Sequence, residues 1–160
     1  MITIDKNFLS ERSLKGKESP RLRSMYNFHT FPEDPVQRMI NALEPYSYVQ
    51  PHKHKDPDKR EVFIALTGSL LVVEFDNEGK ILSHIVLNAR NGNYGVEIAP
   101  RVWHTIVALE SGTTAYELKD GPYIPVTDKN FAPWAPKEGS ENAWFYMENI
   151  LQQLSLKIIF

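Results

Sequence analysis

Short segments of alternating apolar and polar residues fill the chain from Val36 to Lys119. They are separated by turn residues, among them Pro45, Gly68 and the DNEG sequence at 76–79. Alternation with a period of two is typical of strands that bury one face. The eight strands that this pattern predicts are 36–43, 47–54, 61–66, 70–75, 81–87, 94–98, 103–109 and 114–119. Many short strands with regular turns indicate an all-β sandwich or barrel, and a closed double-sheet barrel brings distant segments face to face.

The pattern at the N-terminal end predicts a short separate element. Ile2 and Ile4 alternate as in a strand, and Asp5 is placed to cap a helix that Gly16 ends. The following segment, 19–31, combines arginines with alternating polar and aromatic residues. Taken by itself, this segment is typical of a solvated edge strand.

The alternation stops at Gly121. Segment 121–139 is rich in proline and aromatic residues, which predicts an irregular but well-packed arm. Ser140 is placed to open a helix whose apolar face is formed by Trp144, Met147, Leu151 and Leu154. We therefore expect one domain over 1–160, made of an N-terminal element and arm (1–35), a β-barrel core (36–120) and an irregular arm plus C-terminal helix (121–160).

Composition narrows the classes of function. The net charge of −2 gives no indication of a nucleic-acid partner or of an anionic membrane surface. The N-terminal residues lack the apolar core of a signal peptide, and no apolar run approaches the roughly 20 residues of a membrane span. We expect a soluble, cytoplasmic protein. The chain has no cysteine, so any bound metal must take nitrogen and oxygen ligands.

A set of metal-ligating residue types lies within the predicted barrel. His52 and His54 are two residues apart, so on a strand their imidazoles point to the same face. Glu61 opens the next predicted strand, and His104 follows the bend at Pro100. Three imidazoles and a carboxylate suit one Zn, Ni, Fe(II) or Mn(II) ion. The HKHK sequence by itself is more often a solvated basic loop, so the metal hypothesis depends on all four residues meeting.

These residues resemble the two sequence motifs of the cupins. The first motif is the HxH pair followed by Glu61 and Gly68, with a longer gap after His54 than usual. The second is G-x4-P-x3-H, from Gly95 to His104, which lacks the glycine that usually follows the proline and is one residue shorter there. The resemblance implies a cupin double-stranded β-helix, or jelly-roll barrel.

The sequence is most similar to one cupin subgroup, the WbuC-family cupin-fold metalloproteins. The similar blocks are SPRLRSMYNFH, PVQRMINALEPYSYVQPHKH, RVWHTIVALE, YELKDGPYIP and KNFAPWAPKEG, and they extend from about Ile2 to Gly139. The resemblance implies that His52, His54, Glu61 and His104 are the ligands of one divalent metal ion. Members are bacterial and are often encoded among genes of surface-polysaccharide biosynthesis, whereas the resemblance implies no particular reaction.

Further pocket residues follow from strand alternation and from the family-like blocks. Gln50 shares the predicted face of the histidine pair. The other substrate-binding candidates are Arg21, Arg23, Asn27, Arg38 and Lys119. Arginine forks bind carboxylate or phosphate, which suits a sugar acid or a sugar nucleotide. Glu117 and Tyr123 are the candidate catalytic acid and base. Each of these residues, taken singly, is more often a structural ion pair or a surface charge.

Three functions fit these observations. The first is a metal-dependent isomerase or epimerase that acts on a carbohydrate or sugar nucleotide in polysaccharide biosynthesis. The second is a non-haem iron oxygenase that acts on a small organic acid. The third is a binding module that holds a small sugar-like or anionic ligand without turnover, because one fold hosts many functions. Since cupins commonly pair through sheet edges, we also expect a homodimer, with Ile2, Ile4 and the apolar tail 156–160 as candidate contact surfaces.

Overall fold

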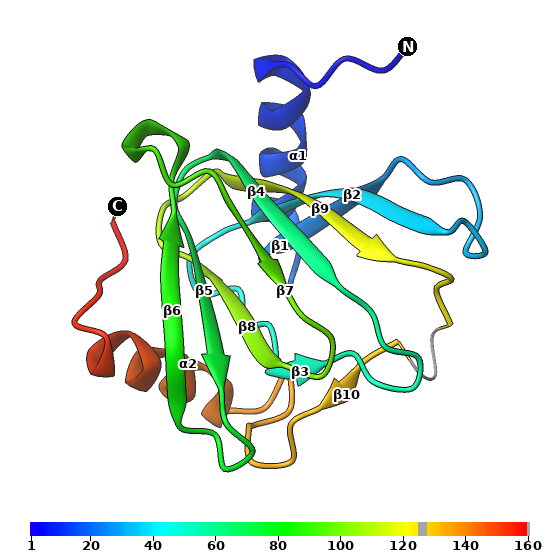
Figure 1. The fold of residues 1–160 in the computed structure, drawn as a ribbon. Helices are drawn as coiled ribbons and strands as arrows, with labels where there is room; N and C mark the ends of the chain where they lie inside the picture. Colours follow the sequence, from blue (N-terminus) through cyan, green and yellow to red (C-terminus); the bar gives the residue numbers. More distant parts are fainter. Residues whose placement is uncertain (125–127, 160) are drawn as a thin grey trace.

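The structure is a computed structural model in which residues 1–124 and 128–159 are described. These residues include two five-stranded antiparallel sheets (Figure 1). The first sheet has the order β1-β2-β9-β4-β7, formed by Arg23–Asn27, Val36–Leu43, Thr113–Asp120, Glu61–Thr67 and Gly95–Ile98. The second has the order β10-β3-β8-β5-β6, formed by Asn130–Phe131, His52–Lys53, Trp103–Ala108, Leu70–Phe75 and Ile81–Leu87. Helices α1 (Lys6–Glu18) and α2 (Asn142–Gln153) and the short 3₁₀ helix η1 (Ala89–Asn91) complete the chain.

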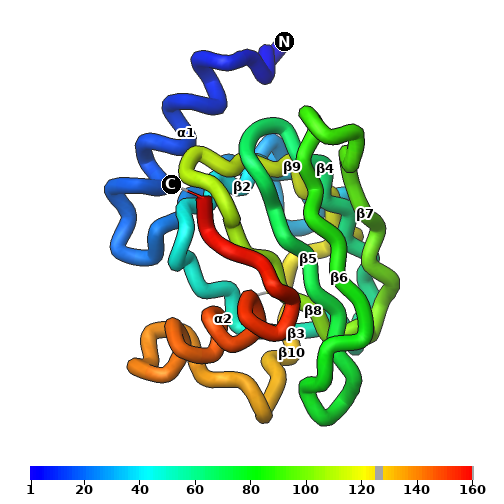
Figure 2. The backbone as a smooth tube through the Cα atoms, turned by 90° about the vertical axis from the view of Figure 1, so that its left-hand side faces the viewer, coloured from blue at the N-terminus to red at the C-terminus, as the bar shows by residue number. Residues whose placement is uncertain are grey.

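The central strands of the second sheet are buried on both faces. In β5, Leu70 and Val72 point into the barrel, whereas Leu71 and Val73 point outward to a second core. That outer core is closed by Met147, Ile150 and Leu151 of α2, so the helix covers the outer face of β5 and β8 (Figure 2). Burial on both faces explains the apolar run Leu70–Val73 of β5, and all six residues of β8 are buried as well.

Helix α1 covers the outer side of β1 and β2. Asp5 caps it as predicted, accepting a hydrogen bond of 2.9 Å from the backbone N–H of Phe8. The prediction that Gly16 ends this helix was wrong, because the helix continues to Glu18. Gly16 instead packs close against β2, where an added Cβ would lie 3.2 Å from the carbonyl oxygen of Ala42. The residues before Asp5 form no strand.

Most predicted strands are confirmed with small changes at their ends, but 47–54 is an exception. Only His52–Lys53 of this segment pairs as a strand. The guanidinium of Arg23 donates a 2.8 Å hydrogen bond to the carbonyl oxygen of Tyr48, and the hydroxyl of Ser47 donates one of 3.0 Å to the carbonyl of Arg21. These two hydrogen bonds hold the segment against β1 and the residues just before it, in place of pairing with a strand.

The C-terminal helix begins at Asn142, two residues after the predicted start at Ser140. Its buried face is Ala143, Met147, Ile150 and Leu151, while Trp144 is 40% exposed. The tail that follows docks on its own chain: Leu156 and Ile158 pack against the outer core, and the N–H of Ile159 bonds to Leu109 at 2.7 Å. Phe160, the last residue of the predicted contact surface, lies outside the described residues. Within the described residues, neither helix has the length and apolar character needed to cross a membrane.

Candidate metal centre

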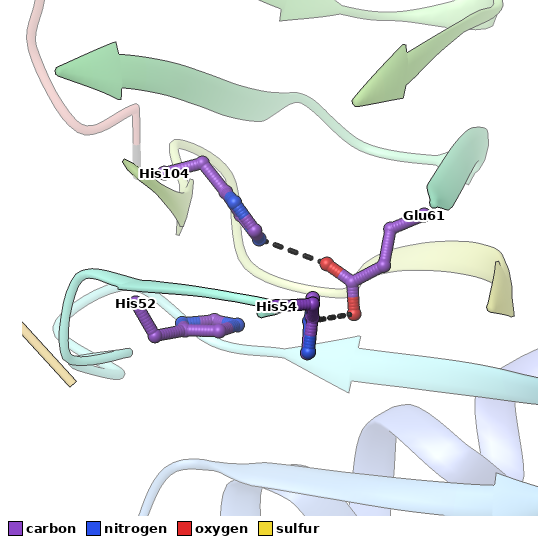
Figure 3. A group of neighbouring side chains, drawn as sticks. All are labelled: His52, His54, Glu61 and His104. Atoms are coloured by element: carbon purple, nitrogen blue, oxygen red, sulfur yellow. Dashed lines mark hydrogen bonds and ion pairs between the residues drawn. The ribbon is translucent and has the colours of Figure 1, made fainter. Parts of the chain in front are cut away.

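The four predicted ligands meet between the two sheets (Figure 3). His52 on β3 lies directly opposite His104 on β8, His54 follows β3, and Glu61 is the first residue of β4. All four side chains are buried, and one ligand atom from each lies within 4.8 Å of the others. The facing sheets therefore bring together residues that are about fifty positions apart in the sequence, as the barrel prediction required.

Each imidazole is oriented by a main-chain carbonyl at its Nδ1 atom. His52 Nδ1 lies 3.0 Å from the oxygen of Gln50, and His104 Nδ1 lies 2.9 Å from that of Val102. His54 Nδ1 contacts the carbonyl oxygen of Asp128 in the same way. A carbonyl only accepts, so each Nδ1 carries a proton, and Nε2 is the atom of each ring that can bind a metal.

The three Nε2 atoms converge on a carboxylate. His104 Nε2 lies 2.8 Å from Glu61 Oε2, and His54 Nε2 lies 2.9 Å from Glu61 Oε1 without the alignment of a hydrogen bond. His52 Nε2 is buried and has no hydrogen-bond partner among the described residues. A buried polar nitrogen without a partner costs free energy, and a bound cation would offset that cost. The residues therefore fit a divalent metal ion, and this set of three imidazoles and one carboxylate suits zinc, nickel, iron(II) or manganese(II).

The charge states of the site agree with this interpretation. Burial would raise the pKa of Glu61, but its contacts with His104 and His54 outweigh burial and hold that pKa well below its ordinary value. Burial, followed by the positive charge of Lys129, holds the pKa of His52 well below its ordinary value. The site thus presents an ionised carboxylate and a neutral imidazole, which are the forms that bind metal.

A cavity of about 620 Å³ opens in front of the ligands. Seven of the eight candidate substrate-binding and catalytic residues line it: Arg21, Arg23, Asn27, Gln50, Glu117, Lys119 and Tyr123. Arg38 is not among the lining residues. Its guanidinium lies 3.3 Å from the carbonyl oxygen of Phe28 and 3.8 Å from the carboxylate of Asp34, with its side chain 43% exposed.

Glu117 projects from β9 into the cavity and is buried. The amide of Asn41, on the neighbouring strand β2, donates a hydrogen bond to its carboxylate. Burial, together with the negative charge of Glu61, raises the pKa of Glu117 to about 7. A carboxyl group with this pKa exchanges its proton readily at neutral pH.

Three of the predicted cationic groups that line the cavity are already paired with acids of the chain. Arg21 and Arg23 both hold Glu138, with contacts from 2.6 to 2.9 Å to its two oxygens. Lys119 lies 2.6 Å from Asp128, whose other oxygen lies 2.9 Å from the fully buried Lys59. Asp128 therefore links both lysines to the segment that orients His54.

The sequence did not indicate several residues of the site. Lys129, Asp128 and Glu138 lie in the proline-rich arm, where no period in the pattern shows which side chains point inward. Asn41 lies on a correctly predicted strand, yet its contact with Glu117 depends on how β2 and β9 are aligned. His29 also lines the cavity.

Comparison with known proteins gives a family. Residues 4–87, just over half of the chain, match the family described as Domain of unknown function (DUF6016). The chain belongs to the DUF6016 family. The DUF6016 match runs from the start of α1 to the end of β6, so it includes His52, His54 and Glu61, while His104 lies beyond it. No curated protein matches this DUF6016 chain.

Solved structures share the fold of the DUF6016 protein at low sequence identity. The Cellulomonas parahominis L-ribose isomerase, solved with L-psicose, has a TM-score of 0.54 at 12% identity, over 71% of this chain and 70% of that chain. The Staphylococcus aureus capsular polysaccharide assembling protein CapF has a TM-score of 0.54 at 19% identity, over 71% of this chain and 32% of that chain. A cupin-2 domain protein from Shewanella frigidimarina has a TM-score of 0.46 at 21% identity, over 61% of this chain and 80% of that chain. At these identities the likeness shows the fold alone. The two facing sheets confirm the predicted double-sheet barrel, and the DUF6016 chain shares its fold with the isomerase and with CapF.

Proposed function

We propose that this protein is a metal-dependent enzyme that isomerises or epimerises a carbohydrate or a sugar nucleotide. The observation that carries the proposal is the convergence of three imidazole nitrogens and one carboxylate, within 4.8 Å of one another, on a cavity of about 620 Å³. Cavities of roughly 300–1,000 Å³ are typical of small-molecule sites. His52, His54, Glu61 and His104 would hold the ion.

The proposed reaction needs a Lewis acid and a group that moves a proton. A bound divalent ion supplies the first by polarising a carbonyl or hydroxyl oxygen. Glu117 supplies the second, because a pKa of about 7 lets the same carboxyl group accept a proton from one carbon and return it to another. Tyr123 is the second proton-transfer candidate, and its ring lies 5.6 Å from the Lys119 ammonium. Asn27 and Gln50 line the cavity, and we propose that they bind sugar hydroxyls.

The comparisons and the family-like blocks support the carbohydrate class. Two proteins that share the fold are an L-ribose isomerase, solved with L-psicose, and a capsular polysaccharide assembling protein. Fold alone does not determine function, so these two likenesses add weight only beside the site. The WbuC-like blocks point in the same direction, and we propose a role in bacterial surface-polysaccharide biosynthesis.

Elemental analysis of the purified protein tests the metal part of the proposal. We expect near-stoichiometric metal in the natural chain and none in a His52→Ala/His104→Ala double variant. A His84→Ala variant is the control, because His84 is exposed on β6. No metal in the natural chain, even after reloading, would overturn the metal-dependent proposal.

Deuterium incorporation tests the reaction. Metal-loaded protein in D₂O with a panel of sugars and sugar nucleotides should introduce deuterium at the carbon next to a carbonyl, as seen by NMR, and a Glu117→Gln variant should not. Oxygen consumption without deuterium incorporation would favour the iron oxygenase instead. Binding without either would favour a non-catalytic binding module.

We also propose that the protein is a cytoplasmic homodimer. Sugar nucleotides are made in the cytoplasm, and the strands β1, β7, β10 and β6 at the ends of the two sheets leave edges for pairing. Ile2 and Ile4 are exposed and available for such a contact. Light scattering at micromolar concentration should give twice the monomer mass of 18.4 kDa, and a monomeric mass would exclude the dimer.

A further inference from the structure

The cavity is lined and supported by more cationic side chains than the binding of a neutral sugar requires. Five cationic side chains reach it or support its lining: Arg21, Arg23, Lys59, Lys119 and Lys129. Glu138 pairs with the two arginines, and Asp128 pairs with Lys59 and Lys119. The remaining acids, Glu61 and Glu117, face the metal site and the proton-transfer position. A divalent ion would add two further positive charges.

Of these five cations, Lys129 is the one without a partner among the described residues. In residues 1–124 and 128–159, its ammonium group has neither a hydrogen bond nor an ion pair. Its side chain is partly buried and lines the cavity. An unpaired ammonium in a partly buried site costs free energy, which a bound anion offsets.

The backbone on both sides of Lys129 is fixed against the metal ligands. The carbonyl of Asp128, the preceding residue, contacts His54 Nδ1. Two residues later, Phe131 of β10 pairs with His52 of β3 and lines the same cavity. Lys129 and Phe131 are thus directed to one side by the two-residue period of extended chain. This places the ammonium group close to the metal centre by the path of the main chain.

Electrostatics agree with that placement. The charge of Lys129 is the second cause, after burial, of the low pKa of His52. Burial lowers the pKa of Lys129 itself, while the charges of Glu61 and Glu117 act in the opposite direction. Lys129 therefore interacts electrostatically with His52 and Glu61 of the metal site and with Glu117.

We propose that Lys129 is the anion-binding residue of the cavity, and that the substrate is an acidic sugar whose carboxylate or phosphate lies between Lys129 and the metal centre. The inference deepens the proposed function and rests on it for the sugar class. It also transfers the expected anion-binding role from Arg21 and Arg23, whose guanidinium groups hold Glu138, to a residue that the sequence pattern did not indicate.

Calorimetric titration with three related sugars tests this inference. The probes are D-glucuronate, D-glucose 6-phosphate and neutral D-glucose, titrated into protein of measured metal content and into chelator-treated protein. We expect one or both anionic sugars to bind more tightly than glucose, and the difference between them identifies carboxylate or phosphate. In Lys129→Met, the dissociation constant of the anionic sugar should rise about 10- to 100-fold, the range for loss of a charge-assisted hydrogen bond.

Two variants control for charge and folding. Lys137→Met removes an exposed lysine of the same arm and should leave the affinity unchanged. Lys129→Arg keeps the charge and should retain most of the affinity, and thermal melting checks that each variant is folded. Equal affinity for glucose and the anionic sugars, no binding of any of the three, or an unchanged dissociation constant in Lys129→Met would overturn the inference. Because metal content is measured separately, anion binding that depends on Lys129 in a protein that takes no metal would refute the metal-dependent enzyme and leave the anion site standing.

Discussion

His52 and His104 lie opposite one another on β3 and β8, with their ring centroids 4.5 Å apart. β3 is only two residues long, and one edge of it is held by the equally short β10. So short a strand adds little stability of its own. An ion bridging the two imidazoles would therefore tie β3 to the long, buried strand β8.

Chelation should for this reason lower the melting temperature. A ligand that binds only the folded state at 100 times its dissociation constant adds about 2.7 kcal/mol. We expect EDTA to destabilise the natural protein by an amount of this order, and to leave the His52→Ala/His104→Ala variant unchanged. Differential scanning calorimetry measures both, and an equal effect of EDTA on the two proteins would contradict a metal at this site.

Glu117 should make stability depend on pH. Its pKa is raised from 4.5 to about 7 in the folded chain, so between these pH values the folded state binds more protons than the unfolded state. The contribution is fully present below pH 4.5 and is lost as the pH rises through about 7. In Glu117→Gln this loss is absent, so the variant should gain on the natural protein by on the order of 2–3 kcal/mol from pH 5 to pH 8.

Urea unfolding of both proteins in EDTA measures that gain. EDTA is required because a bound cation would favour the ionised carboxylate and reduce the shift. A stability difference that stays constant from pH 5 to pH 8 would show that Glu117 has an ordinary pKa in the folded protein.

Asp128→Asn should be strongly destabilising. The carboxylate of Asp128 accepts from Lys59 at 2.9 Å and from Lys119 at 2.6 Å, and all three side chains are buried. Removing the charge leaves the buried ammonium of Lys59 without an acid and that of Lys119 with Glu61 at 4.0 Å, which costs roughly 3–5 kcal/mol. The matched control is Asp58→Asn, which breaks an exposed pair with Arg101 and should cost about 1 kcal/mol or less. Urea unfolding at pH 7 compares them, and similar losses would refute the buried triad.

Gly79→Ala should loosen the arm from the barrel. Gly79 has φ +87°, and an added Cβ would lie 2.7 Å from the ring of Trp134 on the arm. Gly92→Ala is the control, because Gly92 has φ +82° with open space around it and so reports backbone strain alone, about 1 kcal/mol. We expect a larger loss of melting temperature for Gly79→Ala, together with faster proteolysis of the arm. Equal losses would show that Trp134 moves aside without cost.

The double-sheet barrel and the histidine pair could be predicted from local alternation, whereas the resemblance to the cupin motifs joined Glu61 and His104 to that pair as candidate ligands. A period of two places His52 and His54 on one face, and turn residues set the ends of the strands. The failure at 47–54 has a different origin. The carbonyl of Tyr48 bonds to Arg23, 25 residues away in the chain, and local propensity carries no information about such a contact.

The arm shows the same limit more strongly. Lys129 and Glu138 lie in a segment without periodicity, so no pattern indicates that one of them faces the cavity unpaired and the other holds two arginines. Gly16 was correctly singled out in the sequence, but the role predicted for it was wrong. Its lack of a side chain serves the approach to β2 and does not end the helix.

All three imidazoles are oriented by main-chain carbonyls, those of Gln50, Asp128 and Val102. Every amino acid carries such a carbonyl, so substitution of any of these three side chains leaves the orienting acceptor in place. The orientation of the three imidazoles therefore depends on the backbone path, and it does not depend on which side chains these three positions carry. A scaffold of this kind permits the substrate preference of the cavity to diverge under selection without rebuilding the centre that it serves.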